Sequence, residues 1–232
     1  MTLISRWSLL PLVGAAGILA ATAGPASATS SADAKAQKLV ASAIVTTMSA
    51  TSLSIEGTGI SSGQQVKIDV TDGIKDAYGT LSYGGLSTSL RRVGTSIFAK
   101  GTKGFLEKQG ATPTQAAADA NKWFQISSTT DASDYDSVDQ LLTPSLVLSG
   151  LVPSKATGKV TSVKQSSLNG QPVEVVSGTF DGQKASLYVA KHGKPYLLRV
   201  LESSTKSGEG TVSLSNFGKA VHTTAPTVTV KE

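Results

Sequence analysis

The chain has 232 residues, of which 39% are hydrophobic and 16% charged, and it carries a formal net charge of +5 with no cysteine. This length suits one domain, and the low charged fraction excludes a charge-rich disordered chain or a coiled coil. Without cysteine the chain has no disulfide, no thiolate metal site, no cysteine nucleophile and no lipid-modified cysteine.

The first 28 residues have the features of a secretory signal peptide. Arg6 is their only charge, and residues 7–23 are apolar or small. Gly24-Pro25 then breaks any helix, and Ala26-Ser27-Ala28 has the small-residue pattern of a cleavage site. The apolar stretch falls short of the roughly 20 residues that a membrane span needs. We therefore expect cleavage near Ala28 and one mature domain over residues 29–232, either secreted or held in the cell envelope.

The mature chain is predicted to begin with a helix and to continue as strands. Apolar residues recur about every fourth position over Asp33–Met48, which is typical of an amphipathic helix. The period then changes to two, and glycine-containing turns separate the apolar runs. Five short strands are predicted here, over residues 52–56, 66–70, 77–83, 86–93 and 96–100.

The middle of the chain has a different pattern. Thr112-Pro113 predicts the start of a short helix that ends at Ala120. Four aspartates over residues 131–139 are interpreted as a solvated acidic loop, because the glycine and distal glutamate of a calcium loop are missing. The leucine-rich stretch over residues 138–152 is predicted to form two short helices with a break at Pro144.

The last third returns to alternation and predicts the rest of a sheet. Five more strands are expected over residues 160–165, 173–180, 185–191, 196–203 and 210–217. Consecutive strands without intervening helices indicate antiparallel order rather than a parallel sheet. Because a sheet this long curls, the predicted fold class is α+β. It comprises a curved antiparallel half-barrel of about ten strands, covered by a few α-helices around a hydrophobic cavity.

Few residues suggest catalysis. Only two histidines occur, His192 in a turn and His222 near the end of the chain. Residues 59–63 match the G-x-S-x-G pattern, but a nucleophile elbow needs a strand-to-helix turn and both flanks here are predicted strands. Lysine and arginine are scattered, which disfavours nucleic acid as a partner. We therefore predict no enzyme activity, no catalytic residue, no metal and no cofactor.

Several short motifs occur in an order known from one family. They are SLSIEG at 52–57, VGTSIFAKG at 93–101, KWFQI at 122–126, LYVA at 187–190, PYLLRV at 195–200 and LSNFG at 214–218. Through this ordered set the chain resembles the actinobacterial LppX/LprA/LprF/LprG lipoproteins, which are relatives of the LolA/LolB lipoprotein carriers. The resemblance covers nearly the whole mature chain, from about Ala36 to Val228.

The resemblance implies a LolA-like sheet over helices and the carriage of lipids or acylated glycolipids from the plasma membrane into the cell envelope. The chain departs from the lipoproteins in having no lipobox cysteine after the signal peptide, so a freely secreted carrier is expected. The expected partners are the lipid ligand, a membrane in transient contact and, as an option, a membrane protein. The carrier itself is expected to be a monomer.

Apolar side chains along the strands and in the leucine-rich stretch are the candidate lining of the cavity. They are Leu53, Ile55, Val66, Ile68, Leu90, Leu141, Leu142, Leu146, Leu148, Leu187, Val189 and Leu198. The same side chains could instead form a packed core. Two other functions stay open at this point, namely an RseB-like regulatory or sensor module that binds a membrane protein, and a structural envelope protein without a cavity.

Overall fold

The computed structural model describes residues 31–143, 148, 158–180, 182–204 and 208–227. Its helices are α1 (Ser31–Met48), α2 (Lys103–Lys108), α3 (Pro113–Asp119) and α4 (Ala132–Leu141). The strands of the first half are β1 (Leu53–Ser61), β2 (Gln64–Asp72), β3 (Asp76–Tyr83), β4 (Leu86–Val93), β5 (Ser96–Gly101) and β6 (Phe124–Ile126). Those of the second half are β7 (Gly158–Leu168), β8 (Gln171–Phe180), β9 (Gln183–Ala190), β10 (Leu197–Ser204) and β11 (Gly208–Ser215).

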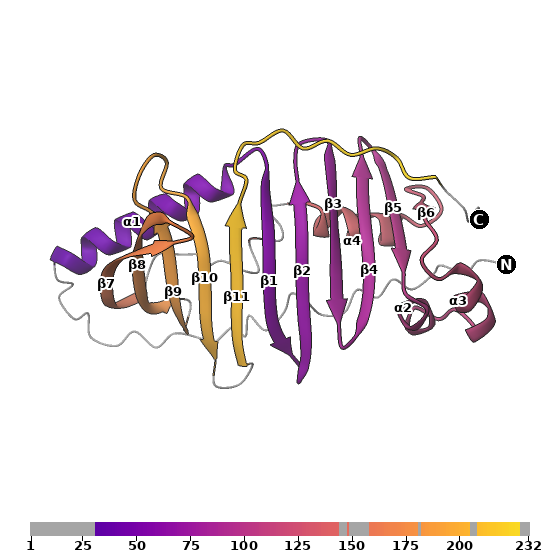
Figure 1. Ribbon diagram of the computed structural model, residues 1–232, viewed down its shortest axis with the longest axis horizontal. Coiled ribbons are helices and arrows are strands. Elements are labelled where there is room, and N and C mark those ends of the chain that lie inside the picture. The colour runs from indigo at the N-terminus through magenta and orange to yellow at the C-terminus, as the bar shows by residue number, and fades with distance from the viewer. Residues whose placement is uncertain (1–30, 144–147, 149–157, 181, 205–207, 228–232) are drawn as a thin grey trace.

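All eleven strands form one open, curved antiparallel sheet (Figure 1) in the order β6-β5-β4-β3-β2-β1-β11-β10-β9-β8-β7. Each half of the chain is a meander, and the halves meet where β1 pairs with β11. The predicted fold class is thereby confirmed, with eleven strands instead of about ten. The additional strand is β6, whose residues had been noted only within the KWFQI motif and which pairs with residues 97–99 of β5.

Tight turns set the register of the hairpins. Asn169 and Gly170 join β7 to β8 with φ values of 51° and 80°. Positive φ at both central residues gives the turn a twist that matches the flanking strands, and Asn-Gly is the pair that adopts it most readily. This turn fixes the register of the hairpin, whose strands pair from Leu168 and Gln171 outward.

Helix α1 packs on the second half of the sheet with one face. Ala36, Val40, Ala43 and Thr47 are buried and recur at helical spacing along that face. The Nε2 atom of Gln37 also donates to the carbonyl oxygen of Gly158 on β7, at 2.9 Å. Figure 1 shows α1 crossing β8, β9 and β10 on the same side of the sheet as α4. We call this side the inner face and the opposite side the outer face.

The inner face carries two hydrophobic clusters. The α1 cluster joins α1 to β1 and β7–β11, and its buried members include Leu53, Ile55, Val176, Leu187 and Val200. The α4 cluster joins α4 and α2 to β2–β6, and its buried members include Val70, Leu90, Ile97, Val138 and Leu142. The core of the molecule is therefore the inner face together with the helices that cover it.

The middle of the chain corrects two predictions. Asp131–Asp139 had been interpreted as a solvated loop, but Ala132–Leu141 is helix α4 and the side chains of Asp131 and Asp134 are buried. Helix α2 had not been predicted. The predicted second helix of the leucine-rich stretch lies outside the described residues except for Leu148, and so does the predicted signal peptide. Across the described ranges, no helix combines the length and apolar character needed to cross a membrane.

Candidate ligand-binding face

An apolar row of side chains runs across the inner face from one cluster to the other. Val176, Leu187, Val200 and Val212 are register partners on four neighbouring strands, so their side chains lie on one face. The row continues through Gly57 and Ile68 to Leu81. The Ile68 side chain packs against both clusters and covers Gly57, where a Cβ atom would lie 2.6 Å from the Ile68 Cγ2 atom. The apolar surface is therefore continuous across the sheet.

The next row of the inner face contains an opening. Gly59 of β1 and Gly210 of β11 lie side by side, and a Cβ atom at Gly59 would meet only the Gly210 Cα atom, at 3.8 Å, among the described residues. Both glycines are partly exposed. We call this pair the glycine floor. Val66 borders it on β2 through its register with Gly59, so the floor adjoins the apolar surface and is open to solvent.

Glu202 borders the glycine floor on its other side. It is the register partner of Gly210 on β10, and its side chain is therefore on the inner face. Partial burial beside this apolar surface raises the pKa of its carboxyl group, because desolvation disfavours the charged form. No cation pairs with Glu202 within the part of the chain that the structure describes. The opening is thus apolar on one side and acidic on the other.

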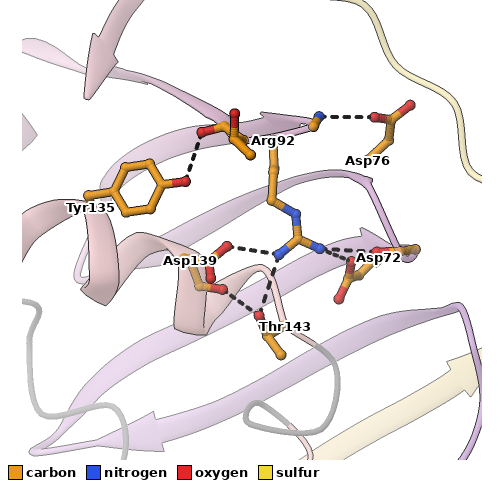
Figure 2. Close-up of polar contacts among 9 residues, drawn as sticks. Asp72, Asp76, Arg92, Tyr135, Asp139 and Thr143 are labelled. Atoms are coloured by element: carbon orange, nitrogen blue, oxygen red, sulfur yellow. Dashed lines mark hydrogen bonds and ion pairs between the residues drawn. The ribbon is translucent and has the colours of Figure 1, made fainter. Parts of the chain in front are cut away.

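A buried polar network interrupts the inner face beneath α4 (Figure 2). The two terminal nitrogens of Arg92 reach in opposite directions, one to Asp72 Oδ1 and the other to Asp139 Oδ1, both at 2.8 Å. The Asp72 side chain is 1% exposed, that of Arg92 12% and that of Asp139 40%. Arg92 also contacts the Gly73 carbonyl at 3.0 Å and Thr143 Oγ1 at 3.4 Å. The guanidinium therefore ties α4, and Thr143 two positions after it, to the sheet.

The network is not fully satisfied. Burial raises the pKa of Asp72 to about 7, because the cost of removing the carboxylate from water exceeds the stabilisation that Arg92 provides. Asp72 Oδ2 and Arg92 Nε are buried and have no hydrogen-bond partner among the described residues. A buried polar atom without a partner costs free energy. The carboxyl group of Asp72 is therefore a group that can take up a proton near neutral pH.

Most of the residues predicted to line a cavity lie on the inner face. Leu53, Ile55, Leu148, Leu187 and Val189 are buried in the α1 cluster, and Leu90 and Leu142 in the α4 cluster. Leu141 is partly buried against the α4 cluster, and Ile68 lies between the two clusters. Val66 borders the glycine floor, and Leu146 lies outside the described residues.

Leu198, which had also been predicted to line the cavity, does not lie on the inner face. A β-bulge between Leu197 and Arg199 shifts the register of β10, so Leu198 joins a small cluster with Val173 and Ala190. Val173 is three residues from Val176, which belongs to the inner face, so this small cluster is on the outer face. The bulge inserts one residue and reverses the alternation locally. Leu198 therefore does not belong with the other candidate residues.

A shallow concavity lies on the outer face of the second half of the sheet. Its volume is about 520 Å³. It is lined by Thr161, Ser177, Gly178, Thr179, Lys184, Ala185, Ser186, Leu201, Glu202, Gly210 and Thr211. Ser177, Ser186, Leu201 and Thr211 are register partners in one row of that face, and this row places the concavity there. Gly178, Ala185, Glu202 and Gly210 belong to the adjacent inward-facing row. Its hydroxyl-rich lining distinguishes it from the apolar inner face.

The features that had suggested chemistry do not assemble into a reactive site. Ser61 ends β1, and Ser62 and Gly63 form the turn to β2, so the G-x-S-x-G pattern lies on a hairpin and not on a strand-to-helix turn. His192 and His222 are both exposed. Among the residues with described positions, no three His, Asp or Glu side chains are grouped so that they could hold a metal ion.

Sequence reasoning missed the polar and the empty parts of this face. Alternation along β4 separates Arg91 and Arg92 onto opposite faces, but it does not show which one meets Asp72. Gly59 and Gly210 are 151 positions apart, and only the pairing of β1 with β11 brings them together. A glycine at an inward position of a predicted strand is the one signal that could have indicated the floor.

LprF from Mycobacterium bovis superimposes with a TM-score of 0.51 and 14% sequence identity, over 83% of this chain and 97% of LprF. The chain shares its fold with LprF. The lipoprotein LppX from Mycobacterium tuberculosis aligns at 15% identity with a TM-score of 0.48, over 82% of this chain and 98% of LppX. No protein-family model matches the sequence, and neither does any curated protein. The fold shared with LprF confirms, at the level of the fold, the resemblance to the LppX/LprA/LprF/LprG lipoproteins that the short motifs predicted.

Proposed function

We propose that the protein is a non-enzymatic carrier that holds the acyl chains of a lipid or acylated glycolipid against the inner face of its sheet. The observation that carries this proposal is the apolar surface that runs without a break through both clusters and opens to solvent at the glycine floor. The LprF-like fold and the predicted signal peptide support a carrier that works outside the plasma membrane.

The chemistry of the inner face suits this ligand class. Burying one acyl chain of about 16 carbons is worth roughly 12 kcal/mol gross, at about 0.8 kcal/mol for each CH₂ group. Association and ordering offset a large share of that gain. Such binding needs apolar area and no precisely placed polar group. The residues predicted to line the site, without Leu198, are the proposed contacts of the acyl chain.

The glycine floor is the proposed entrance. Acyl chains would pass between Val66 and Glu202, over backbone that carries no side chain. They would then separate the α1 and α4 clusters at Ile68, the partly buried side chain that packs against both. The partly buried carboxyl group of Glu202 would lie next to the head group, which favours a ligand whose head carries hydroxyl groups or a positive charge over one with an anionic head.

Native mass spectrometry of the purified protein, followed by lipid extraction, tests the proposal. A co-purified species of lipid mass would support it and would identify the ligand class. A mass of protein alone, together with no uptake of an added fluorescent fatty acid, would contradict it. The sensor and structural functions left open by the sequence would then be the ones to examine.

Filling the glycine floor gives a sharper test. In Gly59→Leu the new side chain projects into the open space above Gly210, so we expect uptake of the fluorescent fatty acid to fall at least tenfold. Thr58→Leu adds a leucine to the exposed outer face of the same strand and should leave uptake unchanged. Because leucine suits a strand better than glycine does, circular dichroism and the thermal midpoint should show that both variants fold. Equal uptake by the two variants would remove the floor from the path of the ligand.

A further inference from the structure

Two cations converge on one indole ring at the β6 end of the sheet. Trp123 directly precedes β6, and its ring centroid lies 5.1 Å from the guanidinium carbon of Arg91 and 5.0 Å from Nζ of Lys100. Both distances are within the range of a cation–π interaction. The three side chains come from β4, β5 and the segment before β6, so they form one local surface.

This surface belongs to the outer face. Arg91 pairs with Tyr78 on one side and Phe98 on the other, whereas its neighbours Leu90 and Arg92 are on the inner face. The Tyr78 side chain is 44% exposed, and Lys122 is exposed beside Trp123. We call Tyr78, Arg91, Lys100, Lys122 and Trp123 the cationic-aromatic patch.

The charges of the patch are not neutralised within the described part of the chain. Neither Arg91 nor Lys100 forms an ion pair there. Arg91 donates to the carbonyl oxygen of Thr224 at 2.7 Å, and its Nε atom has no hydrogen-bond partner among the described residues. Asp76, two residues from Tyr78 on β3, already accepts backbone N–H groups from Gly94 and Thr223. The patch therefore presents positive charge without a matching carboxylate.

We infer that the cationic-aromatic patch docks the protein on an anionic lipid bilayer. Tryptophan and tyrosine favour the boundary between head groups and water, and each lysine or arginine near an anionic membrane surface adds about 1 kcal/mol of attraction. Lysine and arginine also form strong charge-assisted hydrogen bonds with phosphate. This inference rests on the proposed function, because it names the surface on which a carrier would exchange its ligand.

The cationic-aromatic patch lies at the edge of the sheet where the apolar inner face ends. β6 is the edge strand of the sheet (Figure 1), and next to Trp123 the side chains of Phe124 and Ile126 belong to the α4 cluster on the inner face. The outer-face patch and the margin of the apolar inner face therefore meet at one edge. A protein docked through Trp123 would hold that margin beside the bilayer from which a lipid could enter.

The sequence supplies a built-in probe for the experiment. Trp7 and Trp123 are the only tryptophans, and Trp7 belongs to the predicted signal peptide, so in the mature protein that begins at Thr29 the indole emission reports on Trp123 alone. We expect vesicles of phosphatidylcholine mixed with phosphatidylglycerol to bind this protein and to shift the emission of Trp123 to the blue. Vesicles of phosphatidylcholine alone should do neither. Because screening weakens the attraction, high salt should release the bound protein.

Lys100→Gln, in the same mature protein, tests the patch itself. Loss of one cation should weaken binding to the anionic vesicles about fivefold, which corresponds to about 1 kcal/mol. The matched control is Lys164→Gln, because Lys164 is an exposed residue of β7 at the opposite edge of the sheet and loses the same charge. Binding by this control should equal that of the parent.

Three outcomes would overturn the inference. They are no binding to anionic vesicles, equal weakening by both lysine variants, and an equal blue shift with inorganic phosphate alone, which would indicate a small-anion site instead of a docking surface. Uptake of a fluorescent fatty acid from solution, measured without vesicles, tests the proposed function separately. A protein that takes up this probe and ignores vesicles would retain the proposed function and lose the docking surface.

Discussion

At the scale of single residues, Arg91 and Arg92 show how alternation assigns different roles to neighbours. Arg91 lies over Trp123 on the outer face, whereas Arg92 is almost fully buried between the sheet and α4. A buried ion pair is weak evidence for stability as such, because desolvation of the two charges offsets their attraction. Once the pair exists, however, removing one partner leaves the other as an uncompensated buried charge.

We therefore expect Arg92→Met to lower the free energy of unfolding by about 3 kcal/mol or more. The substitution leaves Asp72 buried without a counter-charge and also removes the contact with Asp139 on α4. Urea denaturation at about pH 8, where Asp72 of the parent protein is ionised, measures the change by circular dichroism. The double variant Asp72→Leu/Arg92→Met replaces both partners with apolar side chains, and it should recover most of the lost stability.

Arg91→Met is the matched control for this cycle, since it removes a guanidinium from the adjacent position on the outer face. Its effect should be clearly smaller, because partly exposed charges contribute little to stability. If the double variant were as unstable as Arg92→Met, the loss would come from packing and not from the unpaired carboxylate.

At the scale of elements, α1 and α4 illustrate when the local sequence is sufficient to predict a helix. The period of apolar residues predicted a helix over Asp33–Met48, and α1 spans Ser31–Met48. The pattern was sufficient because the same residues that define it, Val40 and Ala43 among them, are the ones that pack on the sheet. What the pattern could not show is which strands they pack against.

The first part of helix α4, before Val138, was not predicted, because its local sequence does not favour a helix. Its three aspartates and the Asp131 that precedes it favour caps and turns over helix interiors, so the local signal opposes a helix. Tertiary contacts override that signal. Val138 and Leu142 are fully buried in the α4 cluster, the hydroxyl of Tyr135 donates to the carbonyl oxygen of Thr95 at 2.7 Å, and Asp139 binds Arg92. These contacts exist only after the first meander has formed.

A buried hydrogen bond at Thr47 helps to attach helix α1 to strand β10. The Oγ1 atom of Thr47, buried at the end of the helix, accepts the backbone N–H of Leu197 at 2.9 Å. Thr47→Val keeps the shape but leaves a buried donor unpaired, so we expect the free energy of unfolding to fall by about 1–3 kcal/mol. Thr46→Val makes the same chemical change one residue earlier, where the side chain is only partly buried.

Chemical denaturation of the two threonine variants provides the measurement. Hydrogen exchange adds a local readout, because the Leu197 amide should lose protection only in Thr47→Val. A loss of stability shared equally by both variants would mean that helix propensity, and not the bond to Leu197, explains the change.

At the scale of the whole molecule, the sequence predicted the strands better than their assembly. Most strands follow from alternation and from glycine-containing turns, since these signals act between residues close in the chain. The pairing of β1 with β11 joins residues more than 150 positions apart and has no turn to announce it. The glycine floor depends on that pairing, and the bulge that displaced Leu198 depends on the pairing of β9 with β10. The apolar inner face could therefore be predicted, and its entrance could not.

The buried carboxyl of Asp72 makes the stability of the whole fold depend on pH. Its pKa is raised from 3.8 to about 7 in the folded state. Between these values the folded chain holds a proton on Asp72 that the unfolded chain has released. Stability therefore increases as the pH falls through this window, and it decreases as the pH rises through about 7. Glu202, whose pKa is also raised, changes stability in the same direction.

Thermal unfolding measured from about pH 8 to about pH 5 tests this coupling. We expect the midpoint to rise over that interval in the parent protein. In Asp72→Asn, whose side chain cannot ionise, the rise should be much smaller, whereas Glu202→Gln should remove only a minor part of it because Glu202 is more exposed. The direction of the slope decides between two states of the network. A midpoint that falls as the pH is lowered would show that Arg92 holds Asp72 ionised throughout, and that the ion pair, not the proton, fixes α4 to the sheet.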